Sequence, residues 1–263
     1  MIYECFYFWD ELDLLDLKLH ELDGYVDKFV LIEFPTSLRH TPQPLLYDQN
    51  KDRFSDFHDK IIHIIGEDHD KNTMGIGLYG ARKENYTRAF GNCKPNDIII
   101  SSDADACLKH EAVEQIEKSN MENNETQILM DWYCYYMDFL YGGAKFGFNG
   151  ANYFKNIISG GWSSVFRWKP VGTQAFNAGY HFSKLGGTER ILNNLQGYPH
   201  LEMNNEYTNN IEIMRMKIEN GYAWDARGNY KKVMTWVPYK PENYPQYINE
   251  HMDIYGKYFR NRE

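Results

Sequence analysis

Residues 97–105 read Asp-Ile-Ile-Ile-Ser-Ser-Asp-Ala-Asp, an apolar run that ends in two carboxylates one residue apart. Because the apolar residues follow one another without alternation, they predict a parallel strand buried on both faces. Ligands of open α/β sheets bind beyond the carboxyl ends of such strands, where Asp103 and Asp105 would lie. Residues two apart in extended chain point to the same side, so both carboxylates can face one cation. Hard divalent cations prefer oxygen ligands and often add substrate phosphates, so this stretch predicts a site for a metal-bound nucleotide or nucleotide-sugar.

The segments before this strand alternate between strand-like and helix-like patterns. Strand-like apolar runs lie at residues 2–8, 28–33 and 61–65. Leucines recur at helical spacing between residues 12 and 22, and residues 78–91 fit a helix that carries Arg82 and Arg88. Such alternation indicates βαβ units, so we predict an α/β fold with a mainly parallel central sheet flanked by helices. No GxGxxG motif follows the first strand and no GxxxxGK[ST] motif occurs, which disfavours the dinucleotide-binding and P-loop folds.

The composition narrows the class of protein. At 263 residues the chain is long enough for one sizeable core, so we expect a single domain over residues 1–263. Its net charge of −9 argues against nucleic-acid binding, which needs a basic face. No stretch approaches the roughly 20 apolar residues of a membrane span, and the first residues lack signal-peptide features. Four scattered cysteines without zinc spacing indicate free thiols in a reducing compartment, so we expect a cytoplasmic protein.

Beyond residue 125 the sequence becomes aromatic and glycine-rich. Residues 127–140 look like one strand, residues 142–168 have hairpin character, and residues 188–195 start a helix with Thr188 as its cap. Aromatic residues make up 16% of the chain. Sugar-binding sites use aromatic faces as platforms, but an aromatic core explains most of this abundance. It therefore permits a sugar site without indicating one.

Several motifs occur in the order in which a known enzyme family has them. They are Met1–Leu15, Val26–Glu33, Asp97–Asp105 and Ala178–Ser183. In these motifs the chain resembles glycosyltransferase family 17, the group that contains the enzyme adding the bisecting N-acetylglucosamine to N-glycans. The resemblance runs from residue 1 to about residue 255, and motifs in order are more specific than one Asp-X-Asp triplet. After the acidic pair, relatives have Glu-Ile-Pro where this chain has Ala106-Cys107-Leu108.

The resemblance implies a GT-A-type fold, a UDP-sugar donor, a Mn²⁺ or Mg²⁺ cofactor and inversion at the anomeric carbon. It implies that the sugar is N-acetylglucosamine and that the acceptor is a glycan or glycoconjugate. On this basis residues 1–125 are the nucleotide-sugar-binding half of one GT-A-like domain. Residues 126–263 are then the acceptor-binding and catalytic half.

Three residues are the candidates for the metal site. We expect Asp103 and Asp105 to bind the cation, and Asp103 also to face the donor diphosphate. The alternative for both is a cap on the following helix. His181, within the motif Ala178–Ser183, completes the metal shell or touches the diphosphate; the alternative is a packing residue among aromatics.

The catalytic base is the next candidate, because an inverting transfer needs a group that takes the acceptor proton. Glu189 follows a Gly-Gly pair at the start of a helix and is our first choice. The alternative is an acid that the helix dipole favours in a first turn. Asp225 and Glu202 are held in reserve.

The remaining candidates would bind the donor or the acceptor. Arg82 or Arg88 would hold the diphosphate as a fork-shaped donor, and surface arginines are the alternative. Glu33, at a strand end, would accept hydrogen bonds from the nucleoside unless it caps a loop. Trp9, together with Asp10 and Glu11 just past the first strand, would border the base pocket. For acceptor stacking the candidates are Trp132 and Trp162, with core packing as the alternative.

The sequence therefore predicts a metal-dependent, inverting glycosyltransferase. A nucleotidyltransferase uses a similar sheet and metal pair, but it usually has a glycine-rich basic loop after the first strand, where this chain has Phe8-Trp9-Asp10-Glu11. A catalytically silent carbohydrate-binding protein is the other alternative, and it would not need the acidic pair.

Overall fold

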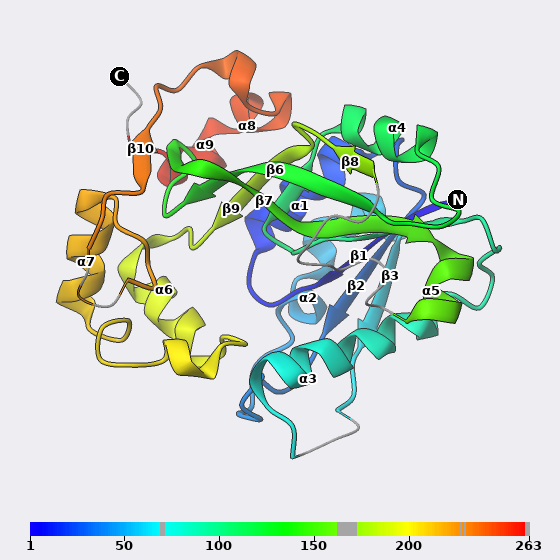
Figure 1. Cartoon of the computed structure of the whole chain (residues 1–263), viewed down its shortest axis with the longest axis horizontal. Helices are drawn as coiled ribbons and strands as arrows, with labels where there is room; N and C mark the ends of the chain where they lie inside the picture. Colours follow the sequence, from blue (N-terminus) through cyan, green and yellow to red (C-terminus); the bar gives the residue numbers. More distant parts are fainter. Residues whose placement is uncertain (69–71, 162–172, 227, 229, 261–263) are drawn as a thin grey trace.

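The computed structural model describes residues 1–68, 72–161, 173–226, 228 and 230–260. Within these residues ten strands form one curled sheet with helices on both sides (Figure 1). The main path of the sheet runs β3-β2-β1-β4-β7-β6-β9-β5, with β8 added beside β6 and β10 beside β7. The α/β class predicted from the sequence is confirmed.

The first part of the sheet is parallel, as predicted. It comprises β1 (Ile2–Tyr7), β2 (Lys28–Glu33), β3 (Ile61–Ile65) and β4 (Ile98–Ser101), in the order β3-β2-β1-β4. Residues 98–100 of β4 are at most 6% exposed, because the strand has β1 and β7 beside it and packed side chains on both faces. This burial explains the apolar run that ends at the acidic pair.

The prediction of a mainly parallel sheet is wrong, because the rest of the sheet is mixed. Strand β7 (Phe139–Tyr153) runs antiparallel to β4 and to β6 (Thr126–Cys134). Residues 127–140, expected to form a single strand, instead comprise most of β6, a turn and the start of β7. The chain turns at Tyr135, whose φ is 71°. Tyrosine is common in strands, and nothing in the sequence shows that Tyr135 adopts a positive φ. The turn was therefore not predicted.

The last strands bring distant segments together. Strand β9 (Gly179–Ser183) pairs parallel with β6 and antiparallel with the short β5 (Ala106–Leu108). Gly179 has a φ of 149°, and a Cβ there would collide with the carbonyl oxygen of Cys107. Glycine is therefore required for β9 to approach β5 this closely.

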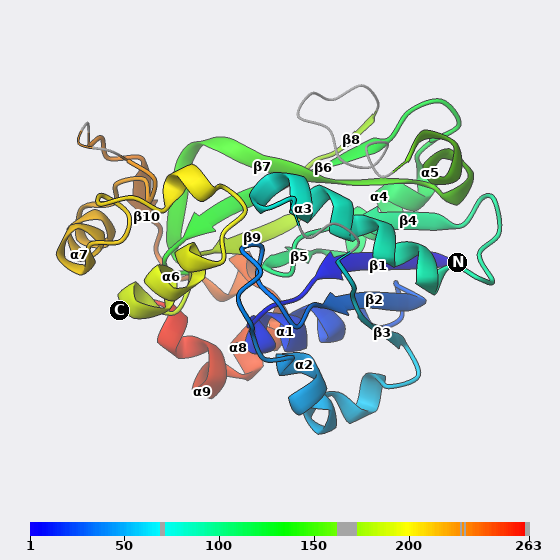
Figure 2. The same ribbon diagram turned by 90° about the horizontal axis from the view of Figure 1, so that it is seen from below.

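Two expected helices differ from the prediction in detail. The expected helix over residues 78–91 is α3 (Gly75–Arg82) followed by the 3₁₀ helix η2 (Lys83–Ala89). The helix expected from Thr188 is α6 (Gly187–Gln196), whose N-cap is Gly186 and has no capping side chain. Residues of α3 and of α6 line the cavity described below; Figure 2 shows where the two helices lie relative to the sheet.

The other elements cover the sheet or extend its far end. They are α1 (Leu12–Leu22), α2 (Leu46–Gln49), η1 (Lys51–Phe57), α4 (His110–Lys118), α5 (Phe154–Gly160), β8 (Thr173–Ala175), η4 (Leu201–Met203), α7 (Ile211–Asn220), β10 (Met234–Trp236), η5 (Pro241–Asn243), α8 (Gln246–Glu250), α9 (Met252–Tyr255) and η6 (Gly256–Tyr258). Within the described residues, no helix combines the length and apolar character that a membrane crossing requires.

Candidate functional site

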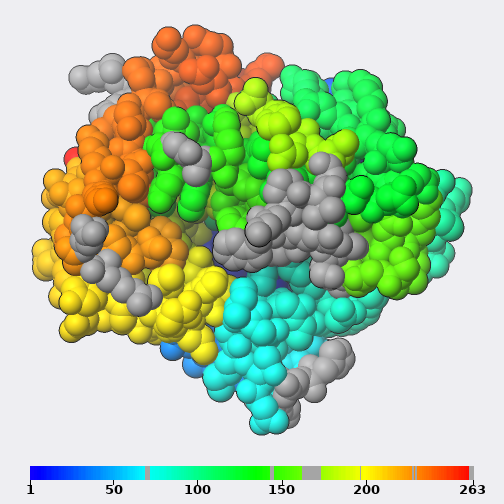
Figure 3. Space-filling view, viewed as in Figure 1, coloured from blue at the N-terminus to red at the C-terminus, as the bar shows by residue number. Residues whose placement is uncertain are grey.

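A cavity of about 540 Å³ opens beyond the carboxyl end of β4. Its wall comes from the end of β1, the turn after β4, the β6–β7 hairpin, the end of β9 and the segment after α6. Figure 3 shows this side of the molecule, where α3, the β6–β7 hairpin and the α6 region meet around a hollow. The cavity thus lies where ligands of α/β sheets bind.

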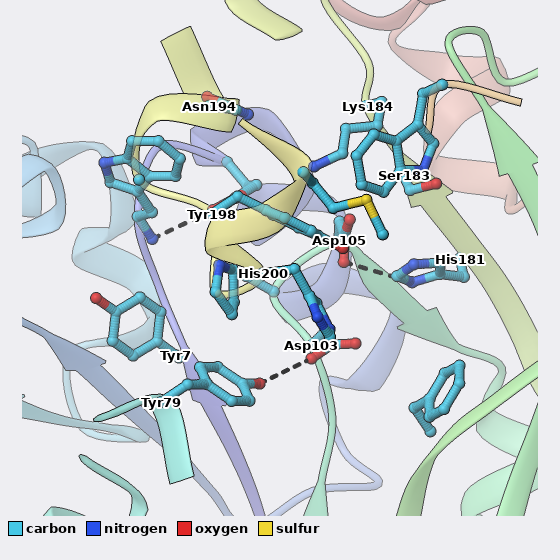
Figure 4. A pocket seen from close by; sticks show the side chains of 18 of the residues that line it. Tyr7, Tyr79, Asp103, Asp105, His181, Ser183, Lys184, Asn194, Tyr198 and His200 are labelled. Atoms are coloured by element: carbon cyan, nitrogen blue, oxygen red, sulfur yellow. Dashed lines mark hydrogen bonds and ion pairs between the residues drawn. The ribbon is translucent and has the colours of Figure 1, made fainter. Parts of the chain in front are cut away.

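Asp103, Asp105 and His181 meet in this cavity. One ligand atom from each of the three lies within 4.8 Å of the others. The β5–β9 ladder fixes this arrangement: Ala106 pairs with His181, and the Phe182 amide donates a hydrogen bond to the Asp105 carbonyl oxygen (2.8 Å). Backbone pairing therefore brings together ligands from both halves of the chain (Figure 4).

The His181 imidazole is fixed by stacking, but one of its ring nitrogens has no hydrogen-bond partner among the described residues. Its ring stacks on Phe146, with ring centroids 3.5 Å apart and an interplanar angle of 12°. Its Nδ1 lies 3.4 Å from Oδ1 of Asp105 but makes no hydrogen bond with any described residue. Burial lowers the pKa of His181 to about 4, so the ring is neutral at pH 7 and has a lone pair available for a metal ion.

Burial also disfavours the charged forms of the two aspartates. It raises the pKa of Asp105 to about 6, and burial together with Asp105 raises the pKa of Asp103. Such shifts occur where acids are crowded without a balancing cation. Two carboxylates and a neutral imidazole that converge in a cavity form a ligand set suited to a divalent ion.

Neighbouring groups fix the orientation of Asp103. Tyr79 donates its hydroxyl hydrogen to Oδ1 of Asp103 (3.2 Å), and the Asp103 amide donates to Oδ1 of Asn149 (3.2 Å). Below the acidic pair, Lys18 forms a fully buried ion pair with Glu4 (2.6 Å) and donates to the Ser102 hydroxyl (3.0 Å). These contacts anchor the turn after β4 from beneath.

The sequence places these features in a known family. The family model described as glycosyltransferase family 17 matches residues 1–160. The chain belongs to glycosyltransferase family 17. Membership indicates a glycosyltransferase, and hence a sugar donor and an acceptor. No curated protein matched the chain.

In this family 17 member, the matched region carries Asp103 and Asp105 but ends before His181. The histidine, expected here from the motif Ala178–Ser183, is brought beside the acidic pair by the fold. Trp9 and Trp132, two of the predicted donor and acceptor residues, also line the cavity. Trp132 stacks on Tyr141, with ring centroids 4.3 Å apart. Trp162 lies outside the described residues.

Arg82 is buried and does not line the cavity. Its guanidinium donates two hydrogen bonds to Asp68 (2.7 and 2.8 Å) and one to the Tyr7 hydroxyl (2.7 Å). It also donates to the carbonyl oxygens of Thr36 and Ser37. Because its donors bind the protein itself, Arg82 holds the loop after β2 and has no free face for a diphosphate.

Three further candidates lie away from the cavity. Glu33 is buried, and its carboxylate accepts hydrogen bonds from the backbone amides of Tyr47 and Asp48, at the start of α2. Arg88 donates to a backbone carbonyl at the protein surface. Glu189 is exposed in the first turn of α6 and faces a separate surface depression. The structure does not bring these three side chains near Asp103, Asp105 and His181.

The sequence analysis did not single out several residues that line the cavity. They include Tyr7, Tyr79, Lys184, Arg190, Tyr198 and His200. Glu11, which was expected with Trp9 to border the base pocket, also lines the cavity. Burial, with Asp10 beside it, raises the pKa of Glu11 to about 8. Tyr7 lies within the motif Met1–Leu15 and Lys184 directly follows the motif Ala178–Ser183, so the sequence gave a signal for these two residues.

Proposed function

We propose that this chain is a metal-dependent, inverting glycosyltransferase with a GT-A-type fold. It transfers a sugar, N-acetylglucosamine, from a UDP donor to a glycan or glycoconjugate. The observation that carries the proposal is the convergence of Asp103, Asp105 and the unpaired His181 Nδ1 in one cavity. Family membership supports the reaction class.

The metal-binding residues are Asp103, Asp105 and His181, and the ion is Mn²⁺ or Mg²⁺. When bound, such an ion neutralises charge on the leaving diphosphate. Phe146 and Tyr79 keep the ligands in place by stacking on His181 and by donating to Asp103. The carboxylates need this support because they repel each other when the ion is absent.

The acidic pair divides the cavity into two sides. Figure 4 shows Tyr7 and Tyr79 on one side of the pair, and His181 and Ser183 on the other. We assign the first side, which also includes Trp9, to the nucleoside because it lies at the carboxyl end of the parallel strands. We assign the second side to the acceptor. Its aromatic lining, with Trp132 stacked on Tyr141, suits the apolar face of a sugar.

We assign the catalytic base to Asp225 and no longer to Glu189. Asp225 lines the cavity beside Trp224, outside the metal group, whereas Glu189 faces away. Glu11 also lines the cavity, but a carboxyl with a pKa of about 8 is mostly protonated at neutral pH. It also accepts hydrogen bonds from the amides of Trp9 and Asp10, which fix it at the start of α1.

The transfer step follows from this assignment. The acceptor oxygen forms a bond to the anomeric carbon while the bond from that carbon to the diphosphate oxygen breaks. The electron pair of the broken bond stays on the diphosphate, and the acceptor proton passes to the Asp225 carboxylate. Attack from the side opposite the diphosphate inverts the anomeric carbon.

Calorimetric titration tests the proposal. UDP and a panel of UDP- and GDP-sugars are titrated with Mn²⁺ and with chelator into wild type, Asp105→Ala and Asp131→Ala. Asp131 is the matched control because it pairs with Lys145 outside the cavity. We expect Mn²⁺-dependent UDP binding that Asp105→Ala abolishes and Asp131→Ala keeps. Absence of nucleotide binding in the wild type would overturn the proposal and favour a sugar-binding protein.

A further inference from the structure

Lys184 enters the cavity through an unfavourable backbone conformation. It directly follows β9, the strand that carries His181, and its φ is 58°. This left-handed conformation is unfavourable for a residue with a Cβ, by about 1 kcal/mol or more. Strain of this kind persists where the surrounding structure enforces it, often at functional sites. Here it accompanies a lysine that lines the cavity with the metal group.

Aromatic rings hold the Lys184 side chain in place. Its Nζ lies 4.1 Å from the ring centroid of Tyr198 and 5.0 Å from that of Trp224. Figure 4 shows Lys184, Tyr198 and Asp105 around the same space. The two rings thus position the ammonium group in the cavity by cation–π contact, and its N–H donors have no hydrogen-bond acceptor among the described residues.

Within the described part of the chain the ammonium forms no ion pair, although Asp105 is near enough to interact with it electrostatically. Arg190, the other long cationic side chain of the cavity, is neutralised by two contacts with Asp10 (2.6 and 3.1 Å) and donates to the Leu185 carbonyl oxygen. By contrast, Lys184 Nζ makes neither a hydrogen bond nor an ion pair with a described residue; its contacts are the two rings. Lys184 is half-buried, so its N–H donors lose part of their hydration, and an anionic ligand would supply the missing hydrogen bonds.

The charges in the site indicate which ligand this is. The carboxylates of Asp103 and Asp105 together cancel the charge of one divalent ion, and a neutral His181 adds nothing. A nucleotide-sugar carries two negative charges on its diphosphate, and another develops as the sugar leaves. The metal group alone therefore leaves this charge uncompensated. Lys184, which forms no ion pair with a described residue, is a cation that lines the same cavity.

We infer that Lys184 binds the diphosphate of the nucleotide-sugar donor and stabilises the charge that develops on this leaving group. This inference rests on the proposed function, because it requires a nucleoside diphosphate in the cavity. The electron pair of the breaking bond goes to the diphosphate oxygen. The Lys184 ammonium donates a hydrogen bond to that phosphate group and keeps its proton.

The test compares Lys184→Met with Lys184→Arg and with a matched lysine. Methionine keeps an unbranched stem against Tyr198 and removes the charge. Lys109 is the control, since it is also half-buried and lies over a tyrosine ring (Tyr180, 4.9 Å) but does not line the cavity. Each variant is titrated calorimetrically with UDP, UMP and uridine, both with Mn²⁺ and with chelator, and its thermal unfolding is recorded.

For Lys184→Met we expect UDP affinity to fall about 10- to 100-fold, the usual effect of losing one charge-assisted hydrogen bond. UMP should lose less, and uridine affinity should stay within about twofold, because only the phosphates contact the ammonium. The preference for UDP over uridine should shrink with chelator as well as with Mn²⁺. Lys184→Arg should recover part of the UDP affinity, and Lys109→Met should match the wild type.

The outcomes separate the inference from the proposed function. If wild type binds UDP and Lys184→Met binds it equally well, the Lys184 inference is overturned while the transferase proposal stands. An equal loss for UDP and uridine in Lys184→Met would also overturn the inference, because it indicates a distorted cavity. If the wild type binds no UDP, both are overturned.

Discussion

The Nδ1 atom of His181 lies 3.4 Å from Oδ1 of Asp105, across two strands that are far apart in the chain. A neutral imidazole nitrogen and a carboxylate oxygen at this separation do not satisfy each other, and the nitrogen has no other described partner. Both atoms can instead bind one ion.

The first prediction concerns the histidine ligand. Replacing His181 by Ala should weaken Mn²⁺ binding by more than about tenfold, because the ion loses one protein ligand. His200→Ala is the control, since His200 lines the same cavity but pairs with Glu202. Calorimetric titration of Mn²⁺ into both variants measures the difference. Equal Mn²⁺ affinities in the two variants would exclude His181 as a ligand.

The second prediction concerns the hydroxyl group that orients Asp103. Tyr79→Phe removes one hydrogen bond to Asp103 and little volume. We expect Mn²⁺ affinity to fall about tenfold, the usual effect of losing a group that orients a metal ligand. The melting temperature should change little. Unchanged Mn²⁺ affinity would show that Asn149 and the backbone suffice to place the carboxylate.

The third prediction contrasts two arginines of one segment. Arg82→Met should lower the free energy of unfolding by about 3 kcal/mol or more, because it leaves the Asp68 carboxylate without its partner in a mostly buried position. Arg88→Met should change it by less than about 0.5 kcal/mol, since Arg88 is exposed. Urea unfolding of both variants checks this. Similar values would mean that the Arg82 network contributes little to stability.

The fourth prediction separates the two candidate bases. Asp225→Asn should lower kcat by about 100-fold or more, as expected for the loss of a general base. Glu189→Gln should leave kcat near the wild-type value, because its side chain is exposed outside the cavity. Steady-state kinetics with the donor found by calorimetry measures both. The reverse result would restore Glu189 as the base.

The fifth prediction concerns acid stability. Asp13 contacts Lys257 (2.7 Å), Arg53 (2.8 Å) and the Tyr258 hydroxyl (2.9 Å). Burial opposes its charge, but these hydrogen bonds outweigh burial and lower the pKa of Asp13. A lowered folded-state pKa gives stability that is present above the unfolded value of about 4 and is lost as pH falls through the folded value.

Asp13→Asn should therefore destabilise the protein by about 1 to 2 kcal/mol at neutral pH. The difference from wild type should shrink below about pH 4, where the wild-type carboxylate also becomes protonated. Urea unfolding at several pH values measures it. A difference that stays constant with pH would show that packing, and not charge, ties Asp13 to the C-terminal segment.

Local pattern predicted part of the fold and of the site. Residues 98–100 formed the expected buried strand, and residues 103 and 105 lie together at its end, because both features depend on near neighbours in sequence. The mixed sheet was missed because it depends on the turn at Tyr135. Tyr79 and Tyr198 were missed because nothing local shows which side chains point into a cavity. Arg82 shows the reverse, since an arginine suited to a phosphate is occupied by Asp68.

The β5–β9 ladder also bears on the order of folding. A chain cut after residue 160 would keep Asp103 and Asp105 but lose His181. Contacts between such distant strands form late, because the entropy of closing the intervening loop opposes them until both strands are in place. An ion that requires all three ligands would bind only chains that had completed this step, and would slow their return to the unfolded state. Metal uptake followed during refolding would then time the last stage of assembly.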